Sequence, residues 1–71
     1  MSVYIQNLKN GHFARGPAQW TEDAKQAQDF SGCVAALLYC HLHHLEMVQV
    51  VGRFENPEQD FIIPVRGLGF E

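Results

Sequence analysis

The stretch that most constrains the fold is residues 31–45, with the sequence SGCVAALLYCHLHHL. It has the densest apolar content in the chain and contains both cysteines and three of the four histidines. Ser31 is a suitable helix N-cap, and Gly32 permits a sharp change of chain direction before a helix. We therefore predict a helix over about residues 31–44, with sheet or a lead-in segment on either side.

At about 100° per residue, the side chains of this helix fall into two stripes. The first is predicted to face the core and consists of Phe30, Val34, Leu38, Leu42 and Leu45. The second, a candidate contact surface, consists of Cys33, Leu37, Cys40 and His44. His41 is placed at the margin of these stripes and His43 on the side expected to face water, so the three histidines do not converge.

The cysteines and histidines leave a metal site as one hypothesis. Cys40 and His44 are four residues apart and His41 and His44 are three apart, spacings that can share an ion on one helix. A complete site needs a further ligand, and His12 is the only distant histidine. We therefore interpret the cysteines as small core residues and predict no metal or other cofactor. The alternative is a metal- or thiol-dependent sensor that uses Cys40, His41 and His44.

No catalytic residue is predicted. Cys40 with His44 as its base is the best nucleophile on paper, but both positions are mid-helix in a domain with little room for a substrate. The chain has no glycine-rich phosphate loop and no G-x-S-x-G motif. A disulfide between Cys33 and Cys40 is excluded within an intact helix, because their Cα atoms would be about 10 Å apart and about 7 Å is the limit.

The flanking segments show strand patterns. Residues 2–9 and 12–15 surround Asn10-Gly11, a dipeptide suited to a tight turn with positive φ at both central residues, and predict a hairpin. Residues 46–54 and 61–65 predict a second hairpin around a turn at 55–58. Pro64 cannot donate to a sheet, so we place it near a strand end or on an edge. Residues 66–71 are expected to form a loose tail.

Residues 20–23 have the pattern of a helix start. Thr21 is a good N-cap, Glu22 and Asp23 favour the positive end of a helix dipole, and Trp20 can staple the entry, which predicts a short helix over about 21–29. The predicted order is ββα(α)ββ in a single α+β domain of residues 1–71. Its two layers are an antiparallel sheet of three or four strands, in two hairpins, and one long or kinked helix. The uncovered face of the sheet is expected to expose apolar groups.

Composition narrows the class of function. A hydrophobic content of 46% is high for a chain of 71 residues and favours a homodimer. The formal net charge is −3 and the basic residues are scattered, so no nucleic-acid partner is predicted. The start lacks a signal-peptide pattern and no apolar run is long enough to span a bilayer, so we predict a cytoplasmic protein without membrane contact. We expect a non-enzymatic protein that contacts itself or another protein.

Several short motifs carry a resemblance. They are Tyr4-Ile5-Gln6-Asn7, Trp20-Thr21-x-Asp23, Ala27-x-x-Phe30-Ser31 and Phe54-x-Asn56-Pro57-x-x-Asp60. In these motifs the chain resembles small uncharacterised bacterial proteins of the structural-genomics type. Their plan is a strand pair, a W-T-x-D helix start and a terminal strand pair. The resemblance implies a bacterial origin and a similar fold, and it carries over no activity, cofactor or catalytic residue.

Overall fold

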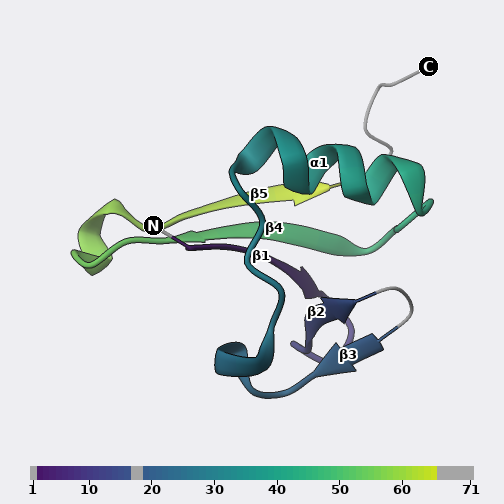
Figure 1. Ribbon diagram of the computed structural model, residues 1–71, viewed down its shortest axis with the longest axis horizontal. Helices are drawn as coiled ribbons and strands as arrows, with labels where there is room; N and C mark the ends of the chain where they lie inside the picture. Colours follow the sequence, from purple (N-terminus) through teal and green to yellow (C-terminus); the bar gives the residue numbers. More distant parts are fainter. Residues whose placement is uncertain (1, 17–18, 66–71) are drawn as a thin grey trace.

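The computed structural model describes residues 2–16 and 19–65. In chain order the elements are β1 (Ser2–Asn7), β2 (Phe13–Gly16), β3 (Gln19–Thr21), the 3₁₀ turn η1 (Ala24–Gln26), α1 (Cys33–Leu42), β4 (Val48–Arg53), the 3₁₀ turn η2 (Pro57–Gln59) and β5 (Phe61–Val65). The strands form one antiparallel sheet in the order β3-β2-β1-β4-β5, and α1 lies over one face of it (Figure 1). This is an α+β fold, as predicted, but the described residues form five strands instead of three or four, in the order βββαββ instead of ββα(α)ββ. The predicted tail at 66–71 lies outside the described residues.

Cross-strand pairing decides which side chains of the sheet face α1. Ile5 of β1 pairs with Val50 of β4, which pairs in turn with Ile63 of β5. Because paired residues project from the same face of a sheet, the strands present one continuous apolar layer toward the helix. The largest fully buried side chains come from this contact: Ile5, Val3, Val48, Val50, Val65 and Cys40.

The other face of the sheet is covered in part by its own side chains. The rings of Tyr4 and Phe13 pack edge to face with their centroids 5.7 Å apart, and the guanidinium carbon of Arg53 lies 5.7 Å from the centroid of the Phe13 ring. Phe13 and Val51 are buried as a result, whereas Ile62 of β5 stays exposed. This face therefore exposes an apolar group at Ile62, as expected, while Phe13 on the same face is buried.

Residues 28–30 close the gap where β1 and β2 diverge. The Phe30 N–H donates to the Val3 carbonyl at 2.9 Å, and the Gln28 N–H donates to the Ala14 carbonyl at 2.9 Å. The Val3 N–H in turn donates to Oδ1 of Asp29 at 2.9 Å. These bonds satisfy backbone N–H and C=O groups of β1 and β2 that the short pairing between the two strands leaves without a partner. They also anchor the chain to the sheet just before α1.

The predicted helix over residues 21–29 is wrong. Trp20 lies in β3, where it pairs with Ala14, and the only helical piece is the three-residue turn η1. Asp23, not Thr21, caps this turn by accepting the Lys25 N–H at 2.9 Å. The hydrogen bonds of residues 28–30 to the sheet require extended backbone, and this tertiary constraint overrides the local helix signals.

Three further predictions are settled by the backbone. The helix expected over 31–44 forms as Cys33–Leu42, with Gly32 rather than Ser31 at the N-cap. Gly11 adopts a φ of +76°, but Asn10 has no positive φ, because the first turn is a longer loop than a two-residue one. The last strand has the predicted bounds, and Pro64 lies in β5 at the edge of the sheet, as expected.

Candidate interaction surface

Helix α1 presents a row of large apolar side chains to solvent. Val34, Leu38 and Leu42 are spaced four residues apart and are 72%, 49% and 72% exposed; we call these three residues the α1 stripe. The helical periodicity predicts them in the core, and that prediction is wrong. The residues of α1 that are buried against the sheet are Ala36 and Cys40.

The size of the inward side chains explains this orientation. The sheet beneath α1 is lined with β-branched residues, and a helix can lie close to such a surface only where its own side chains are small. Ala36 and Cys40 meet this requirement, whereas Leu38 and Leu42 would hold the helix away. Because α1 contains no Asp, Glu, Lys or Arg, no polar face distinguishes the two stripes in the sequence.

The stripe predicted as a contact surface lies instead on the inner side of the helix. Cys40 is buried, while Cys33 and Leu37 are half-buried. Burial raises the pKa of the Cys40 thiol, against the smaller opposing effect of a backbone hydrogen bond. A buried thiol that keeps its proton is a poor nucleophile and a poor metal ligand. The contact-surface prediction is therefore wrong for Leu37 and Cys40, which pack in or against the core.

The histidines near the end of α1 have separate surroundings. His41 is exposed in the last turn of the helix. His43 is the C-cap residue, and its ring lies 4.2 Å from the Tyr39 ring between centroids. His44 is exposed beyond the helix with a φ of +52°. Within residues 2–16 and 19–65, no three His, Cys, Asp or Glu side chains are placed to hold a metal ion, so Cys40, His41 and His44 are not brought together as a ligand set.

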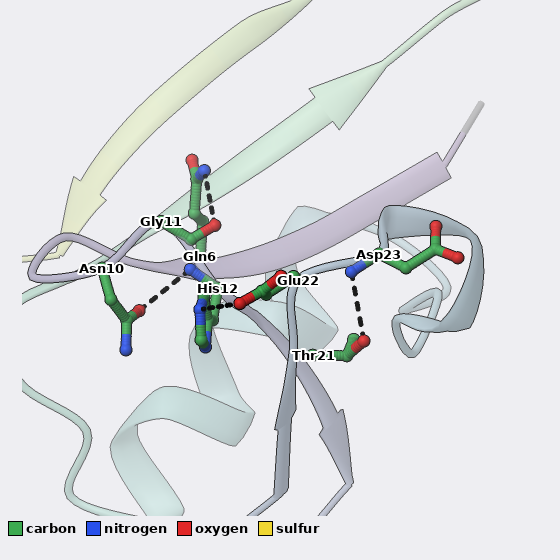
Figure 2. A network of polar contacts seen from close by, with 7 residues as sticks. All are labelled: Gln6, Asn10, Gly11, His12, Thr21, Glu22 and Asp23. Carbon is green, nitrogen blue, oxygen red and sulfur yellow. Dashed lines mark hydrogen bonds and ion pairs between the residues drawn. The ribbon is translucent and has the colours of Figure 1, made fainter.

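His12 belongs to a polar network at the first hairpin loop, shown in Figure 2. Its Nε2 lies 3.5 Å from Oε1 of Glu22, and its backbone N–H donates to Oδ1 of Asn10 at 2.9 Å. Gln6 Nε2 donates to the Gly11 carbonyl across the same loop at 3.0 Å. The network ties the β1–β2 loop to the chain that follows β3, which is a structural role for His12.

A small pocket lies between α1 and strands β2 and β3. It is lined by Ala14, Gly16, Trp20, Tyr39, His43 and Leu45, and its volume is about 40 Å³. Pockets that enclose a drug-sized molecule start at about 300 Å³, so this one is far too small for such a molecule. The i, i+4 spacing of Tyr39 and His43 was a visible signal of this pairing, but nothing in the sequence placed Trp20 beside them.

Comparison with known proteins identifies no relative of this chain. No family model matches it, and no curated protein and no solved structure is similar enough to it to count as a match. Among the described residues, no helix has both the length and the apolar character needed to cross a membrane.

Proposed function

We propose that this is a non-enzymatic cytoplasmic domain that acts through protein contacts, as a homodimer in which the α1 stripes of two copies meet. The observation that carries the proposal is the exposure of Val34, Leu38 and Leu42 at 72%, 49% and 72% on one side of α1. Apolar side chains that form a contiguous exposed patch mark interaction surfaces, whereas scattered ones do not.

A second copy of the chain is the partner that this surface fits. Residues spaced four apart form a ridge, and the ridges of two helices interdigitate at a crossing angle of about −50°. Since α1 contains no charged side chain, two copies can approach about a two-fold axis without like-charge repulsion. A stripe of three side chains covers less than the roughly 800 Å² per partner of a standard interface, so we expect micromolar dissociation.

The β5 edge of the sheet offers a less suitable way to dimerise. Pro64 pairs with Gln49 in the edge strand β5 and has no N–H to donate. Alternate residues of an edge strand present their backbone groups outward, so a strand added here would meet a donor at Ile62 and none at Pro64. Proline on an edge strand is a common protection against sheet extension, which favours the helix as the contact.

Other features support the remaining parts of the proposal. The buried Cys40 and the exposed His41 and His44 give little support to the alternative of a metal- or thiol-dependent sensor. Arg53, one of the few basic residues, packs over the Phe13 ring. It therefore does not contribute to a basic surface of the kind that binds nucleic acids.

Sedimentation equilibrium between about 5 and 500 μM tests the proposal, since this range spans the micromolar affinity expected for a small interface. The wild-type chain should pass from monomer to dimer with concentration, and Leu42→Lys should remain a monomer because its unpaired ammonium group would be buried in an apolar contact. Ile62→Lys is the matched control, since Ile62 is 58% exposed on the opposite face of the sheet. A wild-type monomer throughout, or a dimer abolished by Ile62→Lys and kept by Leu42→Lys, would refute the proposal.

A further inference from the structure

The loop between β1 and β2 contains an asparagine followed directly by a glycine. Asn10 and Gly11 are both exposed, and Gly11 has a φ of +76°. Because Gly11 has no side chain, nothing on that residue shields its backbone nitrogen from the preceding side chain. Asparagine is one of the thermolabile residues of proteins, and here its amide carbon Cγ has the least hindered neighbour that a chain can offer.

Two hydrogen bonds of the loop bear on the reactivity of this pair. The His12 N–H donates to Oδ1 of Asn10 at 2.9 Å (Figure 2), so a donor already points at the oxygen on which negative charge develops when Cγ is attacked. The Gly11 N–H donates to the Asn7 carbonyl at 2.8 Å, and this bond must open before the nitrogen can attack. Because it lies in an exposed loop, its opening requires no wider unfolding.

We infer that Asn10 is a site of spontaneous deamidation in the folded protein. The Gly11 nitrogen gives its proton to water or hydroxide, forms a bond to Cγ of Asn10 and expels Nδ2 as ammonia, which leaves a five-membered succinimide. Water then opens this ring at one of its two carbonyls and yields aspartate or isoaspartate at position 10. The net change is the uptake of one water and the release of one ammonia, without an oxidant, a reductant or a cofactor.

The other two asparagines of the chain lack this combination of features. Asn7 precedes Leu8, whose side chain hinders the backbone nitrogen and whose N–H donates to the Met47 carbonyl at 2.8 Å. Asn56 precedes Pro57, which has no N–H to lose. The chain therefore contains two internal controls for the reaction at Asn10.

Deamidation alters the polar network of this loop. It adds one negative charge to a formal net charge of −3. The new carboxylate lies two residues from His12, whose Nε2 is 3.5 Å from Oε1 of Glu22. In the isoaspartyl product Cβ of residue 10 becomes part of the main chain, so the bond from Gln6 Nε2 to the Gly11 carbonyl must adjust. The product therefore differs from the unreacted chain in both charge and loop geometry.

Incubation of the folded chain in mildly alkaline buffer, followed by anion exchange and peptide mass mapping, tests the inference. A more negative species should accumulate, with the mass gain of an amide converted to an acid at Asn10, while Asn7 and Asn56 stay unchanged. The same chain unfolded in guanidinium chloride gives the rate without the fold. The folded chain should react no more than about tenfold more slowly, because one exposed backbone hydrogen bond must open first.

Asn10→Gln is the matched control variant. It keeps a side-chain amide in the exposed loop but would have to close a six-membered ring, which forms far more slowly, so it should not give the acidic species. A folded rate more than about tenfold below the unfolded rate, equal formation of the acidic species in Asn10→Gln, or faster conversion at Asn7 or Asn56 would overturn the inference. No residue of the α1 stripe takes part, so the inference does not rest on the proposed dimer.

Discussion

At the scale of single residues, the close packing of Gly52 under a phenylalanine ring shows how this small sheet fills its surface. Gly52 pairs with Phe61 across β4 and β5, and a Cβ atom built on Gly52 would collide with the Phe61 ring. The ring therefore occupies the place that a side chain would otherwise take. Covering a strand glycine with a cross-strand aromatic ring is a recognised way to stabilise such a position.

Gly52→Ala should destabilise the protein by about 1–3 kcal/mol, because the Phe61 ring must leave its position or the strands must separate. Urea unfolding followed by circular dichroism measures this loss. In Phe61→Ala the collision is absent, so adding Gly52→Ala to that variant should cost much less than it does in the wild type. Equal costs in both backgrounds would show that the ring does not constrain Gly52.

At the scale of elements, α1 packs against the sheet with the side opposite to the one that its periodicity predicts. The stripe predicted to face the core is exposed, and Cys40 of the predicted contact surface is buried. Leu38 is half exposed, whereas Ala36 is completely buried against the sheet. At about 5 μM protein, where the proposed dimer is dissociated, Leu38→Ala should therefore cost less than about 1 kcal/mol, since it removes a side chain that is already partly in water. Ala36→Leu should cost about 1–3 kcal/mol, because the extra atoms have no space at the helix–sheet contact. Denaturant midpoints that rank the two variants the other way would place α1 in the opposite phase.

The reason why sequence reasoning missed this orientation is physical. The sequence correctly predicts a helix at α1. However, nearly all positions of α1 are apolar, so no polar face shows which side of the helix packs against the sheet. By contrast, β5 is a short run of aromatic and β-branched residues that follows a turn and contains Pro64, and these local signals were enough to predict its bounds and its edge position.

The segment around Trp20 illustrates the other limit. Its residues have the local preferences of a helix start, yet Asp29 and Phe30 bond to Val3 from 26 and more residues away. Such long-range bonds have no signature in the local pattern, and together they impose extended backbone. The aromatic pocket depends on the same rearrangement, because Trp20 reaches Tyr39 and His43 only as part of β3.

At the scale of the whole molecule, the core is thin. Among residues 2–16 and 19–65, the largest fully buried side chains are five β-branched residues of the sheet and Cys40, and none is Leu, Met or aromatic. A chain of 71 residues buries about 60% of the surface that its unfolded form exposes, which leaves a small margin of stability. The leucines that would enlarge the core of a monomer lie instead in the α1 stripe, where a second copy can bury them.

Dimerisation of this kind predicts that thermal stability depends on protein concentration. Binding of a second folded copy stabilises the folded state by mass action. For a domain of this size, raising the concentration from about 5 to 500 μM should raise the Tm on the order of 3–6 °C. In Leu42→Lys the Tm should be the same at both concentrations, while Ile62→Lys should keep the dependence. A wild-type Tm that does not change with concentration would mean that the α1 stripe stays in water, and that the thin core alone holds the fold.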